Sequence, residues 1–178
     1  MFVQELETKK SGLRLVKPDV DRDAPLSVEW LADPHGRETL DLMGVAPRYN
    51  IASSLEAERK RVQDFLDKTD GYNWAIEFNG EVVGAIWYSL KPDDELPAGA
   101  ISFMIGDVVS RGQGVGLAAA DAVCDWLDDG ERLWIYSRYL TKNNASKKLL
   151  ERIGFTADGA VYTDADGLEW QNASKQLG

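Results

Sequence analysis

The sequence predicts a domain of the α/β class, in which helices cover a mixed sheet. Its 178 residues are enough for one domain, residues 1–178, that buries roughly 70 % of the surface of the unfolded chain. Tryptophan, tyrosine and phenylalanine are plentiful, which indicates a packed core. Helical patterns come first, an antiparallel hairpin follows, and strands then alternate with helices, which is the order expected of such a sheet.

One strand and two short helices are predicted at the start of the chain. The apolar run Leu13–Lys17 is typical of a strand. Helical patterns over Asp21–Asp33 and Leu40–Ala46 are broken by Pro34 and Pro47, because proline lacks the N–H that a helix interior needs.

A longer helix and a hairpin are predicted next. Ser53 or Ser54 can cap a helix with one apolar face, since a serine hydroxyl accepts a hydrogen bond from the first turn. The strands Trp74–Phe78 and Glu81–Leu90 flank an Asn-Gly dipeptide, which favours a type I′ hairpin turn.

The second half of the chain predicts alternating strands and helices. A strand over Ala100–Val109 precedes a helix over Leu117–Leu127, and a strand over Leu133–Leu140 precedes a helix over Asn144–Ile153. Two short strands around Asp166-Gly167 are expected to close the sheet.

Charge and residue counts exclude several classes of function. The formal net charge of −10 argues against nucleic acid as a partner, because phosphate binding needs a basic surface. The same acidic balance slightly favours a cationic substrate. Cys124 and His35 are each alone of their type, so we expect neither a disulfide nor a Cys/His metal site. Without a basic leader or a membrane-length apolar run, the sequence predicts a cytoplasmic protein that binds no membrane.

The glycine-rich segment Arg111–Gly116 is the clearest candidate binding site. It lies between a predicted strand and a predicted helix, where backbone N–H groups converge and the helix dipole favours an anion. A nucleoside-triphosphate P-loop is excluded, because Gly116 is not followed by Lys and Ser or Thr. The segment therefore predicts a phosphate cradle of another kind.

A dinucleotide-binding site is one alternative for this segment. Gly114-x-Gly116-x-x-Ala119 has the required spacing, and Arg138 on the next strand could meet the 2′-phosphate of NADP. That strand carries no Asp or Glu for the ribose of NAD. An NADP-dependent oxidoreductase is therefore a competing interpretation.

A family resemblance supports a different ligand. Arg111-x-x-Gly114-x-Gly116 resembles the (Gln/Arg)-x-x-Gly-x-(Gly/Ala) signature of the GCN5-related N-acetyltransferases (the GNAT superfamily). Asn143–Phe155 resembles the Asn-x-x-Ser-x-x-Leu-x-Glu-(Lys/Arg)-x-Gly-Phe block of the same family. Ile105-Gly106-Asp107 is similar to its branch of ribosomal-protein-alanine and spermidine acetyltransferases.

The resemblance implies a GNAT fold with a mostly antiparallel sheet of about six to seven strands. It also implies that the strands at Ala100 and Leu133 splay apart and that the pantetheine of acetyl-CoA lies between them. The pyrophosphate would lie on the glycine-rich segment, and the pantetheine would pair with the backbone near Val108 and Val109. The implied cofactor-binding residues are Val108, Val109, Arg111, Gly112, Gln113, Gly114, Val115, Gly116, Asn143 and Ser146.

Members of this family transfer the acetyl group directly to an amine, and the resemblance leaves the acid and the base open. Ser146 is the candidate acid, although its hydroxyl equally suits helix capping. Asp107 and Glu77 are the candidate bases; Asp107 could instead orient the loop and Glu77 could face solvent. Where many relatives have a glutamate and a tyrosine, this chain has Ala100 and Leu150.

The function predicted from these features is acetyl transfer from acetyl-CoA to a primary amine: a protein N-terminus, a polyamine, an aminoglycoside or another small amine. The early helices and the hairpin are expected to shape the acceptor pocket, and they carry no motif that names the acceptor. A CoA-binding regulatory module without activity is an alternative, suggested by the replacements at Ala100 and Leu150. Either a monomer or a homodimer is compatible with the sequence.

Overall fold

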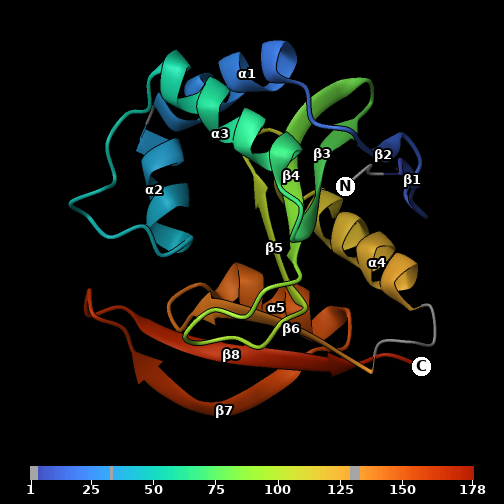
Figure 1. The fold of residues 1–178 in the computed structure, drawn as a ribbon, viewed down its shortest axis with the longest axis vertical. Coiled ribbons are helices and arrows are strands. Elements are labelled where there is room, and N and C mark those ends of the chain that lie inside the picture. Colours follow the sequence, from blue (N-terminus) through green and yellow to red (C-terminus); the bar gives the residue numbers. More distant parts are fainter. Residues whose placement is uncertain (1–3, 33, 129–132) are drawn as a thin grey trace.

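The computed structural model describes residues 4–32, 34–128 and 133–178, which form one eight-stranded sheet with helices on both faces (Figure 1). The strands are β1 (Leu6–Glu7), β2 (Leu13–Val16), β3 (Gly71–Phe78), β4 (Glu81–Ser89), β5 (Ala100–Ile105), β6 (Trp134–Leu140), β7 (Thr156–Thr163) and β8 (Glu169–Gln176). The helices are α1 (Val20–Ala32), α2 (Pro34–Leu42), α3 (Leu55–Asp67), α4 (Val115–Leu127) and α5 (Asn144–Arg152).

The order of strands in the sheet is β1-β2-β3-β4-β5-β6-β8-β7. Every neighbouring pair is antiparallel except β5 and β6, which are parallel. The predicted fold class, a mixed and mostly antiparallel sheet flanked by helices, is therefore confirmed. The sheet exceeds the expected strand number because β1 has only two residues, too few for a sequence pattern.

The two faces of the sheet bury different sets of side chains, since successive residues of a strand point to opposite sides. Leu15 and Trp74 pack in the larger core together with apolar residues of α4 such as Val123. Val16 and Ala75, one residue further along each strand, pack on the other face against Leu26 and Trp30 of α1. These two clusters place α4 and α1 on opposite sides of the sheet (Figure 1).

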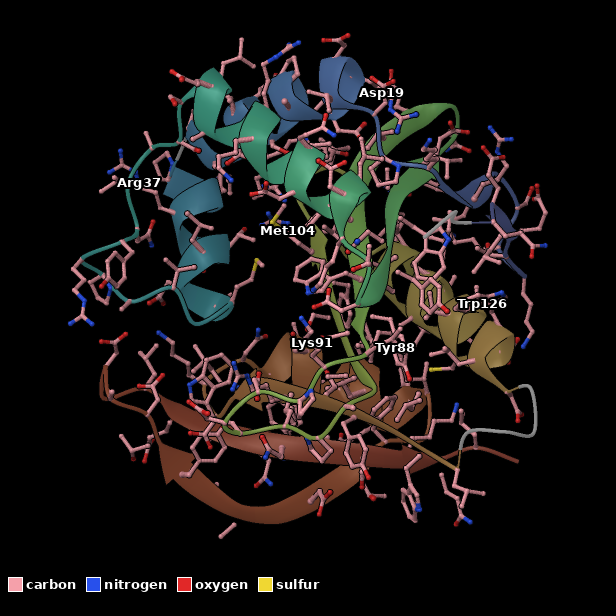
Figure 2. The ribbon with its side chains drawn as sticks, viewed as in Figure 1. Asp19, Arg37, Tyr88, Lys91, Met104 and Trp126 are labelled. Carbon is pink, nitrogen blue, oxygen red and sulfur yellow. The ribbon has the colours of Figure 1, made fainter. Side chains whose placement is uncertain are left out.

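Aromatic side chains join α4 to the central strands. Trp126 meets Tyr72 and Trp74 of β3 edge-on, with ring centroids 4.9 and 5.3 Å apart (Figure 2). Edge-to-face contacts are a favourable arrangement of aromatic rings, because the positive ring edge faces the negative ring face. These contacts fix the C-terminal end of α4 against the sheet.

Two local signals in the sequence have the predicted effect. Ser54 is the N-cap of α3, and its hydroxyl accepts a hydrogen bond of 3.1 Å from the N–H of Ala57. Asn79 and Gly80 have φ angles of 55° and 88°, as a type I′ turn between β3 and β4 requires.

The predicted helix over Leu40–Ala46 is wrong in its position. The observed helix α2 begins at Pro34 and ends at Leu42, so Pro34 opens a helix and does not only end the previous one. Proline is favoured in the first turn, where its missing N–H would have no partner. Gly44, with φ of 84°, then turns the chain away from the helix axis. The predicted end of the first helix, Asp33, lies outside the described residues.

Of the helices in the described ranges, none is both long enough and apolar enough to cross a membrane.

Cys124 is buried in α4, and its burial raises the pKa of the thiol to about 11. Because the thiolate is the reactive form, the folded protein should resist alkylation by iodoacetamide at about pH 8, whereas the protein unfolded in urea should react readily. Mass spectrometry of the two samples measures this difference. Equal labelling of the folded and unfolded protein would show that α4 opens readily.

Candidate functional site

The gap between β5 and β6 is the starting point of the site. The two strands pair at one position only, Ala100 with Tyr136, and Ser137 adds a hydrogen bond of 2.9 Å from its hydroxyl to the carbonyl of Ile101. Beyond that point the strands diverge (Figure 1). The splayed pair that the family resemblance implied is therefore present.

The end of β5 differs from the prediction. The strand ends at Ile105, and the Asp107 carboxylate accepts hydrogen bonds from the N–H groups of Val109 (3.2 Å) and Ser110 (3.0 Å) and from the Ser110 hydroxyl (2.5 Å). These contacts fold the following residues into a turn. Val108 and Val109 thus lie outside the strand, and Val109 is 80 % exposed, so the structure does not present them as a strand edge for pantetheine.

The glycine-rich segment forms a turn that leads directly into α4. Gly114 is the N-cap of the helix with φ of 78°, and no side chain caps the first turn. A Cβ added at Gly112 or at Gly114 would meet no atom within 4 Å. The first turn of α4 therefore has N–H groups that no side chain caps, and such a helix N-terminus suits an anion.

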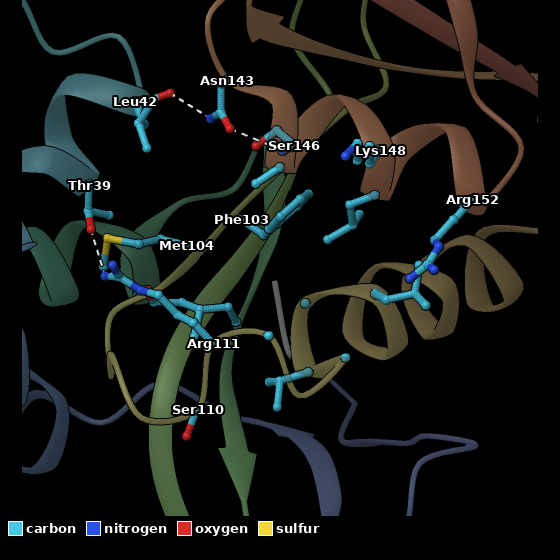
Figure 3. A pocket seen from close by; sticks show the side chains of 18 of the residues that line it. Thr39, Leu42, Phe103, Met104, Ser110, Arg111, Asn143, Ser146, Lys148 and Arg152 are labelled. Atoms are coloured by element: carbon cyan, nitrogen blue, oxygen red, sulfur yellow. Dashed lines mark hydrogen bonds between the residues drawn. The ribbon is translucent and has the colours of Figure 1, made fainter.

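A cavity of about 750 Å³, here called the loop cavity, opens above this turn. It lies between the end of β5, the start of α4, one side of α5 and the end of α2 (Figure 3). The predicted cofactor-binding residues that line it are Arg111, Gly112, Gly114, Val115, Gly116, Asn143 and Ser146. Cavities of this size are typical of small-molecule and cofactor sites.

Two basic side chains on α5, which the motif analysis missed, also line the loop cavity. Lys148 and Arg152 are one helical turn apart, so they project from the same side of the helix. Figure 3 shows them opposite Thr39 and Arg111. Neither has an ion-pair partner among the described residues, although the chain carries an excess of acidic residues. Their spacing of four residues in the predicted helix is the sequence signal that could have identified them.

Arg111 and Gln113 hold the loop itself. The Arg111 guanidinium donates hydrogen bonds to the carbonyls of Ile105 (3.0 Å) and Gly106 (3.2 Å) and to the hydroxyl of Thr39 on α2 (2.6 Å). Gln113 donates to the carbonyl of Val109 at 2.9 Å and does not line the loop cavity. Both side chains therefore help to fix the shape of the loop, and the cofactor contact of Gln113 stays a prediction.

The N-terminus of α5 meets the end of α2 through Asn143. The Asn143 side chain accepts a hydrogen bond from the N–H of Ser146 (3.1 Å) and donates one to the carbonyl of Leu42 (2.9 Å; Figure 3). Both ends of the amide are thus used within the protein. The Ser146 hydroxyl makes no hydrogen bond to the described part of the chain, so the cap depends on the backbone of Ser146 and leaves its side chain free.

Replacing Asn143 by alanine should lower the free energy of unfolding by about 1 kcal/mol, because an N-cap is lost. The Asn143→Asp variant keeps the accepting oxygen but cannot donate to Leu42. Urea unfolding should therefore place it between the wild type and the alanine variant. Equal stability of all three proteins would contradict the capping role.

Further contacts hold the end of α2 against the C-terminal half of the chain. Lys142 pairs with Asp41 at 2.6 Å, and Arg48 pairs with Asp166 in the turn between β7 and β8. Gly44 packs so closely on the Trp170 ring that a Cβ would lie 2.1 Å from it. These contacts place α2 across one side of the loop cavity.

A second cavity of about 370 Å³, here called the polar cavity, adjoins the first. The two share Leu42, Met43, Phe103, Asn143 and Ser146 as lining residues. Ser146 therefore lies where the cavities meet.

Two positions highlighted by the sequence line the polar cavity. Ala100 and Leu150, which replace the expected glutamate and tyrosine, both face it, and so does Tyr139 of β6. Burial, followed by the negative charge of Glu151, raises the pKa of Tyr139. A phenol whose pKa is raised thus lines the same cavity as Leu150, the position where the sequence lacks the expected tyrosine.

The candidate bases are not brought to either cavity. Glu77 on β3 binds Arg14 on β2 through hydrogen bonds of 2.5 and 3.1 Å. Both carboxylate oxygens of Asp107 are occupied by its own loop. Glu77 thus lies in a cross-strand ion pair, and Asp107 orients its own loop, which favours the alternative role that the sequence left open for Asp107.

The predicted NADP contact is not brought to the glycine-rich turn. Arg138 lines the polar cavity, with its guanidinium 4.7 Å from the centroid of the Trp170 ring and one nitrogen 3.7 Å from Asp93. Within the described ranges, no group of three or more His, Cys, Asp or Glu side chains is placed to hold a metal ion.

Comparison with known proteins gives a family and a fold. The sequence model described as "Acetyltransferase (GNAT) domain" matches residues 12–156. No curated protein matches the chain. Among solved structures, the ribosomal L7/L12 α-N-protein acetyltransferase RimL, in complex with coenzyme A, is 16 % identical, with a TM-score of 0.77 over 98 % of each chain.

Two further solved structures have the same fold and are named for different activities. The microcin C7 self-immunity acetyltransferase MccE, in complex with acetyl-CoA and AMP, is 14 % identical, with a TM-score of 0.75 over 94 % of each chain. The aminoglycoside acetyltransferase AAC(6′)-Ib, in complex with coenzyme A, is 18 % identical, with a TM-score of 0.69 over 92 % of this chain and 93 % of its own. Identities this low establish a shared fold and leave the acceptor open.

Proposed function

The chain belongs to the GNAT acetyltransferase family, and from this premise we propose that its loop cavity binds acetyl-CoA and that it transfers the acetyl group to a primary amine. Members of this family use acetyl-CoA as co-substrate. Membership also removes the NADP-dependent oxidoreductase as an interpretation of the glycine-rich turn.

One observation carries the proposal: uncapped N–H groups at the start of α4 face a cavity whose opposite side presents Lys148 and Arg152. A helix N-terminus and two cations together suit a ligand with several phosphate groups. We assign the pyrophosphate of acetyl-CoA to the glycine-rich turn and its remaining phosphate to the basic pair on α5.

For the pantetheine we propose a different partner from the one predicted at Val108 and Val109. Phe103, Met104 and Ile105 line the loop cavity at the open end of β5. We assign the pairing of pantetheine to the backbone of these three residues. The thioester then lies toward the junction of the loop and polar cavities, where the free hydroxyl of Ser146 is found.

In the proposed reaction the amine nitrogen attacks the thioester carbonyl, and the carbon–sulfur bond breaks. The nitrogen loses a proton to solvent and the coenzyme A thiolate gains one. Deprotonating an ordinary alkylamine at pH 7 costs about 4.6 kcal/mol, so the site must favour the neutral amine. We propose the polar cavity as the route by which this proton reaches solvent.

The proton for the thiolate has two candidate donors. Ser146 lies at the junction of the cavities and its hydroxyl is free, whereas Tyr139 lies on the polar side only. We propose Ser146 as the group that hydrogen-bonds to the departing sulfur and relays the proton, with Tyr139 as the second candidate.

The proposal is tested by incubating the protein with acetyl-CoA and a panel of primary amines, and by measuring released thiol together with the mass of the acetylated amine. The panel contains a peptide with a free N-terminus, a polyamine, an aminoglycoside and simple arylalkylamines. Turnover of any amine supports the proposal. Binding of acetyl-CoA without turnover of the whole panel would favour the inactive CoA-binding module.

A further inference from the structure

A third cavity, here called the apolar cavity, lies between α1, α2, α3 and strands β4 and β5, and its volume is about 590 Å³. Most of its lining is aliphatic or aromatic, including Leu31, Leu40, Val45 and Phe65. None of the motifs found in the sequence accounts for it. A cavity of this volume holds a small organic molecule.

The apolar cavity shares lining residues with the proposed reaction site. Met43 lines the loop cavity, the polar cavity and the apolar cavity. Met104 of β5, labelled in Figure 2, lines both the loop cavity and the apolar cavity. Methionine side chains are flexible and adapt to the shape of a bound group. A molecule in the apolar cavity can therefore present one end to the thioester.

The charged groups that line the apolar cavity are already neutralised. Glu58 accepts a hydrogen bond of 2.7 Å from the Nε of Arg61, and Arg61 donates a second bond of 2.9 Å to Ser27. The Arg61 guanidinium also lies over the Phe65 ring, 5.2 Å from its centroid. A second positive charge on a ligand would find no free carboxylate there, and an unpaired buried charge is strongly unfavourable.

The rim of the apolar cavity is also apolar. Tyr49 and Ile51, in the segment between α2 and α3, line it and are 62 % and 69 % exposed. Large apolar side chains exposed at the mouth of an apolar cavity are typical of a binding site.

Resting on the proposed acetyl transfer, we propose that the acceptor is an amine with a bulky apolar or aromatic body and no second positive charge, and that this body binds in the apolar cavity. The amine end passes Met43 and Met104 to reach the thioester. This assignment reverses the preference for a cationic substrate that the overall charge of the chain suggested, because the local charges at the cavity cancel.

The test measures binding of tryptamine and of spermidine to the complex of the protein with coenzyme A by calorimetry, separately from acetyl transfer. Tryptamine should bind at least about tenfold more tightly, since each methylene-sized group buried contributes about fourfold. The Ala57→Trp variant fills the cavity from an exposed position on α3 and should abolish tryptamine binding. The matched control, Glu56→Trp, adds the same ring at the preceding exposed position, which does not line the cavity.

Loss of tryptamine binding in Ala57→Trp but not in Glu56→Trp supports the proposal, whether or not acetyl transfer is seen. Tighter binding of spermidine, absence of tryptamine binding, or equal effects of the two variants would overturn it. Transfer to spermidine alone would leave the acetyltransferase proposal standing while removing the apolar acceptor.

Discussion

Replacing Lys148 and Arg152 together by alanine should weaken acetyl-CoA binding by at least about 100-fold, because each charge-assisted hydrogen bond to a phosphate is worth about 1.5–3 kcal/mol. Both side chains line the loop cavity, and neither has an ion-pair partner among the described residues. Calorimetric titration measures the loss. The dependence of binding on salt should become less steep, since fewer cations then face the ligand.

Lys147→Ala is the matched control for this prediction. Lys147 neighbours Lys148 on α5, does not line the cavity, and lies 3.9 Å from Glu151. Its removal should change binding by less than about twofold, since exposed ion pairs contribute little. An equal loss in Lys147→Ala would mean that the charge of the helix matters in general and that Lys148 and Arg152 do not contact a phosphate.

Ser146→Ala should lower kcat by about 100-fold and leave both KM for acetyl-CoA and the free energy of unfolding nearly unchanged. The hydrogen bond that caps α5 comes from the backbone N–H of Ser146, which alanine keeps. The side chain therefore contributes to proton transfer without contributing to the helix cap. Steady-state kinetics and urea unfolding of the same preparation separate the two effects.

The Tyr139→Phe variant tests the second candidate proton donor against Ser146. Since burial raises the pKa of this phenol above its usual value near 10, it remains protonated throughout the neutral range. If Tyr139 is the donor, Tyr139→Phe lowers kcat at all pH values below that point while Ser146→Ala leaves kcat intact. That pattern would replace Ser146 by Tyr139 as the source of the proton.

Short local signals were reliable guides to the elements. The serine cap of α3 and the Asn-Gly turn between β3 and β4 depend only on neighbouring residues, so the sequence predicts them directly. The end of β5 at Ile105 was mispredicted because it depends on Asp107, whose carboxylate takes the N–H groups that would continue the strand. An apolar run does not reveal that competition.

In the candidate site, too, continuous motifs were predicted from the sequence, whereas contacts between distant segments were not. The glycine-rich turn and the N-terminus of α5 lie together as expected, since each is one continuous motif. The ion pair of Glu77 could not be predicted, because its pairing with Arg14 depends on the register of β2 against β3. The sequence also did not predict that α2 and the residue after it line the loop cavity, because tertiary packing brings Thr39 and Met43 there.

Calorimetric titration of the protein with acetyl-CoA and with NADPH, beside the variants Gly114→Trp and Gly167→Trp, tests the central claim most directly. Both glycines have φ of 78° and open space around the missing Cβ, so the two variants carry a similar backbone strain. Only Gly114 lies at the loop cavity. Acetyl-CoA should bind the wild type and Gly167→Trp, and binding to Gly114→Trp should fall by at least about 100-fold. Equal binding of acetyl-CoA to both variants, or binding of NADPH alone, would contradict the assignment of the glycine-rich turn to coenzyme A.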